Sequence, residues 1–289
     1  MGRKKRWEVY DIVDGYGEVH LYSWRYFFDF IQQEMLDYKT YIWRGERCDN
    51  WMLESTLDRL IKKVNIAKSK RNDFRREHLE QFKFAARGRR GPNPSRLDNE
   101  NDWWALGQHF GLATPLLDWT TSPFVAAYFA YIKVGESQSK MRTIYALHRP
   151  SIEEKAQELL NIEKSEIQSK KKEYETNGKL SGLLAGALLD GPVRPQMEFI
   201  RPFSDENQRL VNQGGLFTRA PDDMDIETWV KTNFKRDTGY ILMKILLPNK
   251  DREICLRSLN RMNINHLTLF PDLYGSSVYC NLFAEIKKY

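Results

Sequence analysis

The chain has 289 residues, of which 41% are hydrophobic and 13% aromatic. A chain of this length and composition can bury a large apolar core, which excludes an intrinsically disordered protein. Its formal net charge is +6 and is unevenly placed, because residues 62–96 contain twelve Lys or Arg against three acidic residues.

No stretch approaches the roughly 20 apolar residues that a membrane span needs. The basic start of the chain is followed by charged and aromatic residues, not by the apolar core of a signal peptide. Cys48, Cys255 and Cys280 are odd in number and widely spaced, which favours reduced thiols over a disulfide framework or a zinc site. We therefore expect a cytoplasmic protein that has no membrane contact and no metal site.

The first part of the chain alternates between extended and helical patterns. Residues 7–21 alternate around an Asp-Gly turn and predict a hairpin. A helix is expected from Ser23 to about residue 36, a strand over residues 41–45, and one long helix over residues 56–86. The residues after it are rich in Gly, Pro and Arg and predict an exposed loop over 87–94.

The centre of the chain has the clearest helix start. Asp102 is expected to cap a helix over residues 103–110, and a strand is expected over residues 114–119. Ser122 and Pro123 are typical of a helix start, because a serine caps free amides and proline lacks the amide that would need a partner. The helix that follows, residues 124–132, is apolar on all sides and is expected to be buried.

The remaining patterns complete an α+β fold. In chain order they predict a strand over 142–148, a charged helix over 151–174, an apolar helix over 180–189, strands over 209–213 and 216–218 around a Gly-Gly bulge, a strand over 240–247, and helices over 252–262 and 276–287. The expected architecture is a single domain with a mixed central β-sheet flanked by helices.

Arg44 is a candidate ligand-binding residue. It ends a predicted strand, and Gly45 beside it would let a ligand approach the backbone closely. A guanidinium in that position can bind a phosphate or a carboxylate with two hydrogen bonds. The alternative is a structural arginine that is paired with Asp118.

His109 and Asp118 are two further polar candidates. His109 lies at the end of a predicted helix, where the helix dipole favours its charged form, so it can bind an anion, exchange a proton or simply cap the helix. Asp118 lies in an apolar strand and needs a partner if it is buried. A pair with Arg44 or Arg209 would make it an organiser of the site; the alternative role is a catalytic base.

Two segments suit phosphate groups. Thr120, Thr121 and Ser122 place hydroxyls and amides at the start of the buried helix, which suits a phosphate or serves only as capping. The basic residues 62–96 are compatible with a nucleic-acid surface or, alternatively, with a solvated helix face and a flexible loop.

These candidates lie in three islands of sequence: Trp43-Arg44-Gly45, the run from His109 to Thr120, and the run from Arg209 to Thr218. Together they resemble the FRG domain, which carries an aromatic–Arg–Gly signature. The middle run is similar to the family's HYGLPTRLLDWT motif, with departures at Phe110, Ala113 and residues 115–116. Residues 269–273 also fit the family's ending. The resemblance implies one FRG-type domain over residues 1–289, with a core of about 20–275 and a helical insertion at about 151–177.

The order of the islands is also distantly similar to ADP-ribosyltransferases of the Arg–Ser–Glu type. In that family an arginine holds the phosphates of NAD, a middle strand orients the nicotinamide ribose, and a late glutamate stabilises the charge on that ribose. Arg44, residues 119–122 and Gln213 take those places here. Gln213 cannot supply a negative charge, so Asp118 or Glu198 would have to supply it.

The leading hypothesis is an ADP-ribosyltransferase-like enzyme that uses NAD to modify nucleic acid or protein, as a toxin or anti-phage defence effector. The resemblance gives catalytic roles to His109, Asp118 and Gln213. It gives contacts with NAD to Arg44, Gly45, Thr114, Trp119, Thr120 and Ser122. The alternative is a non-catalytic module that binds a nucleotide or nucleic acid, and a metal-independent nuclease ranks third. Residues 62–96 would guide a nucleic acid, and a regulatory partner protein is compatible with either function.

Overall fold

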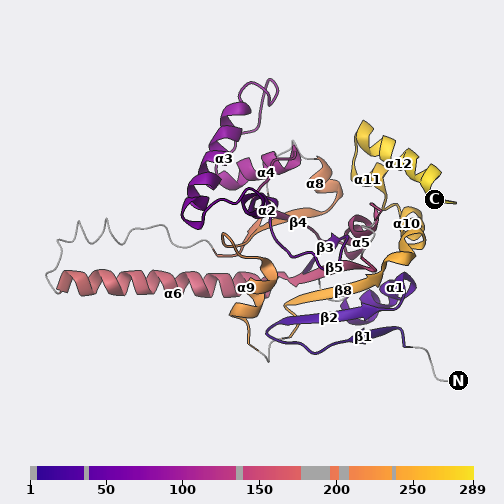
Figure 1. Ribbon diagram of the computed structural model, residues 1–289, viewed down its shortest axis with the longest axis horizontal. Helices are drawn as coiled ribbons and strands as arrows, with labels where there is room; N and C mark the ends of the chain where they lie inside the picture. Colours follow the sequence, from indigo (N-terminus) through magenta and orange to yellow (C-terminus); the bar gives the residue numbers. More distant parts are fainter. Residues whose placement is uncertain (1–4, 36–38, 135–138, 177–195, 202–207, 236–238) are drawn as a thin grey trace.

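The computed structural model describes residues 5–35, 39–134, 139–176, 196–201, 208–235 and 239–289. Within these ranges eight strands form one sheet in the order β1-β2-β8-β5-β3-β4-β7-β6 (Figure 1). The strands are β1 (Trp7–Val9), β2 (Tyr16–Leu21), β3 (Tyr41–Glu46), β4 (Leu116–Thr120), β5 (Met141–His148), β6 (Glu198–Ile200), β7 (Gly215–Arg219) and β8 (Leu242–Pro248). Strands β2 and β8 are parallel, and the other neighbours are antiparallel. This confirms the predicted α+β domain with a mixed sheet.

The helices flank this sheet. In chain order they are η1 (Trp24–Tyr26), α1 (Phe27–Phe30), η2 (Ile31–Met35), α2 (Thr56–Lys63), η3 (Lys68–Lys70), α3 (Arg71–Ala85), α4 (Glu100–His109), α5 (Pro123–Tyr131), α6 (Arg149–Thr176), α8 (Gln208–Asn212), α9 (Ile226–Asn233), η4 (Asn249–Asp251), α10 (Arg252–Arg261), α11 (His266–Leu269) and α12 (Leu273–Glu285). The apolar helix predicted over residues 180–189 lies outside the described residues.

Alternation along the central strands divides the core between the two faces of the sheet. In β5, Ile144 and Ala146 point to the face covered by α1, α5 and α10. The residues between and after them, Tyr145 and Leu147, point to the opposite face, which packs against α9 and the first turns of α6. A third apolar cluster joins α2, α3 and α4 to the β4 and β7 end of the sheet.

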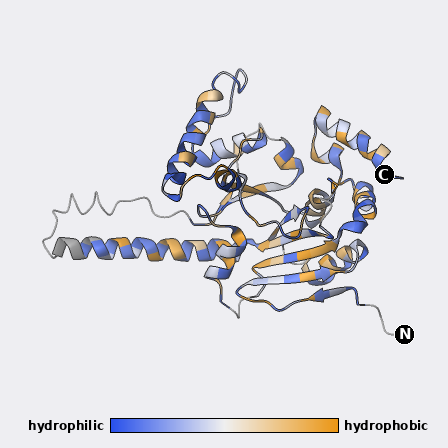
Figure 2. Ribbon diagram, in the orientation of Figure 1, coloured by the Kyte–Doolittle hydropathy of each residue, from blue (hydrophilic) through white to orange (hydrophobic). Residues whose placement is uncertain are grey.

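Helix α6 leaves the body of the protein after its first turns. Ile152 and Ala156 are buried against the sheet, whereas Ile162, further along the helix, is 46% exposed. Figure 1 shows the helix extending away from the sheet, and Figure 2 shows that it is largely hydrophilic. The structure thus confirms the predicted charged helix, and only its beginning contributes to the core.

The long helix predicted over residues 56–86 is wrong in one respect, because the chain breaks it into α2, η3 and α3. Asn65 adopts φ 56°, a left-handed conformation that asparagine tolerates and that ends helices. The amide of Ile66 donates back to the carbonyl of Ile61 at 3.1 Å, which completes the helix end.

The strand predicted over residues 209–213 is also wrong, because Gln208–Asn212 form the helix α8. The apolar alternation there was too short to separate a strand from one helical turn. The strand that follows, β7, is confirmed. The cap of α4 is Asn99, whose side chain accepts from the amide of Asp102, rather than Asp102 itself. No helix among the described residues is long and apolar enough to cross a bilayer.

Candidate functional site

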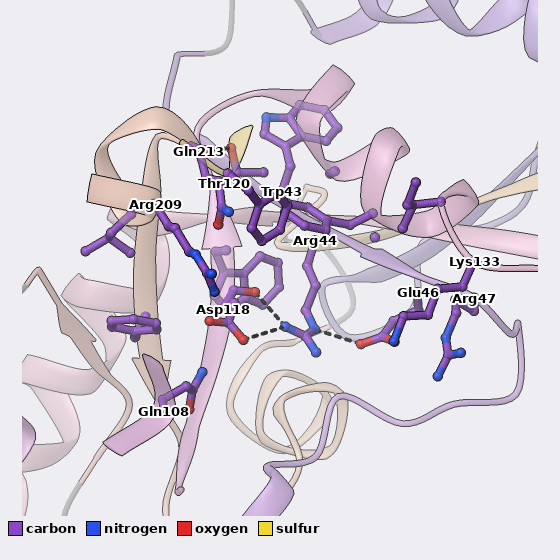
Figure 3. A pocket seen from close by; sticks show the side chains of 18 of the residues that line it. Trp43, Arg44, Glu46, Arg47, Gln108, Asp118, Thr120, Lys133, Arg209 and Gln213 are labelled. Carbon is purple, nitrogen blue, oxygen red and sulfur yellow. Dashed lines mark hydrogen bonds and ion pairs between the residues drawn. The ribbon is translucent and has the colours of Figure 1, made fainter. Parts of the chain in front are cut away.

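A cavity of about 510 Å³ lies beside β3 and β4, two interior strands of the sheet that share one paired position, Trp43 opposite Thr120. Residues from all three sequence islands line it (Figure 3). The lining consists of Trp43, Arg44, Gly45, Glu46, Arg47, Trp51, Arg59, Gln108, His109, Asp118, Trp119, Thr120, Ala126, Phe129, Ile132, Lys133, Arg209, Leu210, Gln213, Phe217 and Phe270.

Arg44 is held from two sides inside the cavity (Figure 3). Its Nε donates to Glu46 Oε1 at 2.7 Å, and its Nη1 donates to the backbone carbonyl of Asp118 at 2.7 Å. The Asp118 carboxylate lies further away, 3.8 Å from Nη1. Burial opposes the charge of Arg44, but Glu46 and Asp118 outweigh burial and raise its pKa. Arg44 is therefore a charged residue that binds its own protein on both sides.

Glu46 is a site residue that the sequence reasoning did not find. Its side chain is only 10% exposed and forms an ion pair with Arg44. Residues two apart in a strand point to the same face, so Arg44 and Glu46 emerge together. That periodicity was the signal that could have identified Glu46 as the carboxylate closest to Arg44.

Gly45 is required by packing against α5. A Cβ at this position would lie 1.9 Å from the carbonyl oxygen of Ala126 and 2.7 Å from the amide of Ala130. Packing thus requires a glycine at this position, and because Gly45 also lines the cavity, its contact with a ligand stays a prediction. Because the glycine admits α5, it also brings Phe129 and Lys133, at and beyond the end of that helix, to the cavity.

Three residues of the middle sequence island lie on strand β4 and have different roles. Asp118 is an open carboxylate, with a side chain that is 66% exposed. Trp119 is buried and donates from its indole to Thr218 Oγ1 at 2.8 Å. The hydroxyl of Thr120 donates to the carbonyl of Gln213 at 2.6 Å, which ties β4 to the end of α8.

Thr114 and Ser122 are not among the residues that line the cavity. Thr114 is fully buried and bonds with Thr56 and Gln108. Ser122 caps α5 by accepting from the amide of Val125. The amides of Thr121 and Ser122 already donate to the Gly214 carbonyl and the Thr120 hydroxyl, so these two amides are not free to bind a phosphate.

Gln213 reaches the cavity, but its side chain amide donates to the carbonyl of Leu269 at 3.2 Å. Glu198, the other acid considered from sequence, lies on β6, where it accepts from Asn101 at 3.1 Å, and it does not line the cavity. Arg209 pairs with Asp272 rather than with Asp118.

His109 lies at the end of α4, as predicted, and lines the cavity. Burial, followed by the charge of Arg209, lowers its pKa, against a smaller opposing effect of Asp272. The expectation that the helix dipole holds this histidine in its charged form is therefore wrong, because burial and a nearby cation outweigh the dipole. A neutral His109 can accept or donate one hydrogen bond at each nitrogen.

The lining combines positive charge with aromatic surface. Among the described lining residues, five cations (Arg44, Arg47, Arg59, Lys133 and Arg209) face two carboxylates (Glu46 and Asp118). Partly exposed aromatic rings lie in the same cavity, at Trp51, Phe129 and Phe270. A surface with these two properties suits a ligand that has negative charge and a planar ring. Within the described part of the chain, no three acidic, His or Cys side chains gather in a set that could hold a metal ion.

The basic residues 62–96 form the end of α2, then η3, α3 and the loop after it. Part of their charge is neutralised within the fold. Arg75 is 7% exposed and contacts Asp58, Asp222 and Asp223, and Arg71 also contacts Asp223. Lys63, Lys68 and Lys70 remain exposed.

Among known protein families, the FRG domain matches residues 39–140 of this chain. No curated protein and no solved structure matches the chain. The matched residues include β3, α4, β4 and α5, whereas the island at 209–218 lies beyond them. The FRG domain match thus covers the segment that supplies Arg44, Glu46, His109, Asp118 and Lys133 to the cavity.

Proposed function

We propose that the cavity around Arg44 binds a nucleotide that carries phosphate groups, that this nucleotide is NAD, and that the protein transfers ADP-ribose from it. The observation that carries the proposal is the pairing of an excess of cations with partly exposed aromatic rings in one cavity. Cations suit the phosphates, and the rings suit a nicotinamide or an adenine.

The reaction requires negative charge near the ribose. As the bond between the ribose C1′ and the nicotinamide nitrogen breaks, nicotinamide leaves with the electron pair and positive charge develops on the ribose. A nucleophile of the acceptor then bonds to C1′ and loses its proton. Glu46 and Asp118 are the two carboxylates among the described lining residues. Fixed charges at such a position often accelerate a reaction more than any other feature of an active site.

Glu46 is the better candidate for this role. It is nearly buried and fixed by Arg44, whereas the Asp118 side chain is open to solvent. A charge held in a partly dry site stabilises a transition state more strongly than one in water. Neutral His109 is the candidate that takes the proton from the acceptor. Nucleic acid or protein remains the proposed acceptor, as a toxin or defence effector would require.

The experiment is a titration of the purified protein with NAD, coupled to measurement of nicotinamide release with and without DNA, RNA and a cell lysate. Glu46→Gln keeps an oxygen for Arg44 but removes the charge, so it should retain binding while lowering turnover by roughly 100-fold or more. Asp118→Asn is the matched control and should have a smaller effect. Absence of NAD binding by the unmodified protein would refute the proposal.

A second candidate function is a non-catalytic nucleotide-binding module. The observation in its favour is that Gln213, in the place that the transferase family gives to a glutamate, hydrogen-bonds to Leu269 through its amide. NAD binding without nicotinamide release under any condition would favour this function.

A further inference from the structure

We propose that the phosphate groups of the ligand bind to Arg47 and Lys133, and not to Arg44. This inference rests on the proposed function, because it assumes that the cavity around Arg44 takes a nucleotide. It assigns the binding of the ligand's negatively charged groups to two residues that lie outside the three sequence islands.

Arg44 is already engaged by other groups of the protein. Its Nε and Nη1 are occupied by Glu46 and by the Asp118 carbonyl, both at 2.7 Å. The N–H groups of Nη1 and Nη2 that remain could still reach a phosphate, but the charge of Arg44 is already matched by Glu46, and a phosphate that displaced Glu46 would leave this nearly buried carboxylate without its partner. Leaving a buried charge unpaired in this way is costly. Arg44 therefore shapes the cavity and offers a phosphate little.

Arg47 and Lys133, in contrast, keep an unmatched positive charge. Both line the cavity, and Figure 3 shows them on the same side of Arg44, near Glu46. Neither forms an ion pair with another described residue, in contrast to Arg44 and Arg209. Because the charge of Glu46 is already matched by Arg44, the two further cations leave this side of the cavity positive.

The side chain of Arg47 and the backbone of Lys133 are held in place before a ligand binds. The guanidinium carbon of Arg47 lies 4.8 Å from the centre of the Trp51 ring, so stacking restricts the side chain before any ligand arrives. Lys133 is fixed through its backbone, since its carbonyl accepts from the Arg142 Nη2 at 3.1 Å. An arginine fork that is already oriented loses less freedom on binding a phosphate than a free one does.

The test measures binding of NAD, nicotinamide riboside and inorganic pyrophosphate by calorimetry. Arg47→Gln with Lys133→Gln should weaken NAD and pyrophosphate by roughly 10- to 100-fold for each cation removed, and should leave nicotinamide riboside nearly unchanged. The matched control is Lys287→Gln with Arg261→Gln, which removes the same charge from exposed positions outside the cavity. The control should bind all three compounds as the unmodified protein does.

The outcomes separate this inference from the function on which it rests. If NAD binds the double variant as tightly as the unmodified protein, the phosphate assignment is overturned and the NAD proposal stands. If pyrophosphate binds through Arg47 and Lys133 but NAD does not bind, the assignment stands and NAD is the wrong ligand. If neither NAD nor pyrophosphate binds the unmodified protein, both the phosphate assignment and the NAD proposal are overturned.

Folding of the variants is checked by thermal melting. If Arg47→Gln fails to fold because it no longer stacks on Trp51, Lys133→Gln alone repeats the test. The side chain of Lys133 forms no hydrogen bond or ion pair with another described residue, so its removal should leave the fold intact. Arg47→Lys then serves as the charge-preserving partner and should bind pyrophosphate more tightly than Arg47→Gln.

Discussion

Arg44 donates from Nη1 to the backbone carbonyl of Asp118 at 2.7 Å, across two strands that are paired only at Trp43 and Thr120. The side chain thus replaces ladder hydrogen bonds that the diverging strands do not make. A residue expected to hold a ligand therefore also holds the sheet together beside the cavity.

We predict that Arg44→Ala lowers the free energy of unfolding by about 3 kcal/mol, because it leaves the nearly buried Glu46 without its ion-pair partner and removes the hydrogen bond to β4. Urea denaturation would measure this. The control is Arg209→Ala, whose pair with Asp272 is about one-third exposed and should cost at most about 1 kcal/mol. Equal effects of the two substitutions would contradict the structural role of Arg44.

Gly45→Ala is expected to prevent stable folding, or to cost at least about 3 kcal/mol, because the new methyl group would overlap the backbone of α5. Gly239→Ala is the control, since a Cβ there meets nothing within 4 Å. Soluble expression and thermal melting would compare the two. A Gly45→Ala protein that melts like the control would mean that α5 can move away from β3.

His266 predicts a dependence of stability on pH. It is 7% exposed, and its Nδ1 shares a hydrogen bond of 2.9 Å with the Tyr128 hydroxyl. Its ring stacks on that of Phe270, with 4.1 Å between the ring centres. Burial lowers its pKa from 6.5 to about 4, with smaller opposing and supporting effects of Asp272, Arg209 and Lys133. Between these two values the unfolded chain binds more protons, so the stability contribution is complete above pH 6.5 and is lost as the pH falls toward 4.

The expected loss from His266 between pH 7.5 and pH 5 is about 2 kcal/mol. Urea denaturation at both pH values would measure it in the unmodified protein and in His266→Phe, which keeps a stacking ring. His109 and His148 also have lowered pKa values and add a loss of the same sign in both proteins. A variant that loses as much stability as the unmodified protein would contradict the buried, neutral state of His266.

Gln213→Glu tests whether residue 213 can serve as the glutamate of the transferase family. The new carboxylate would face the carbonyl of Leu269, to which the glutamine amide now donates. We predict a loss of about 1 kcal/mol in unfolding free energy and no gain in nicotinamide release. Gln108→Glu adds the same charge to the same cavity but keeps an acceptor for Thr114. A gain in release specific to Gln213→Glu would place this residue at the reacting carbon.

We propose that nucleic acid binds residues 62–96 through those cations that are exposed and form no ion pair with another described residue. Replacing Lys63, Lys68 and Lys70 by Gln should weaken DNA or RNA binding and reduce the slope of log affinity against log salt by up to about 3. The control replaces Lys62, Arg76 and Lys83, which pair with Glu54, Asp73 and Glu80. Fluorescence anisotropy at several salt concentrations would measure both. Equal slopes in all three proteins would exclude this segment as the binding surface.

The sequence predicted the elements whose signals are local. The Ser122-Pro123 start of α5 and the apolar run after it indicated the position of a buried helix, and β3 was predicted to within one residue. The break was missed because the apolar spacing continues across it, whereas the backbone turns left-handed at Asn65 and extended at Ala67. Helix α8 was mistaken for a strand because a run of five residues is too short for its periodicity to decide.

The candidate site was predicted as far as its residues lie in the three sequence islands. Arg44, His109, Asp118 and Gln213 do meet in one cavity. Their contacts depend on packing that spacing does not reveal, such as the donation of Gln213 to Leu269. Glu46 could have been found from the period of two along β3. Lys133 could not have been found from the sequence, because it reaches the cavity only through the packing of α5 over Gly45.

The place of β8 in the sheet has a consequence for how this protein forms during synthesis. This strand lies between β2 and β5, yet it is the last of the eight described strands to leave the ribosome. Until it emerges, the hairpin of β1 and β2 has no edge to join, and both β2 and β5 expose unpaired backbone groups. The nascent chain therefore carries two open strand edges while residues 149–241 are made, which makes this interval the one in which chaperone binding or aggregation competes with folding.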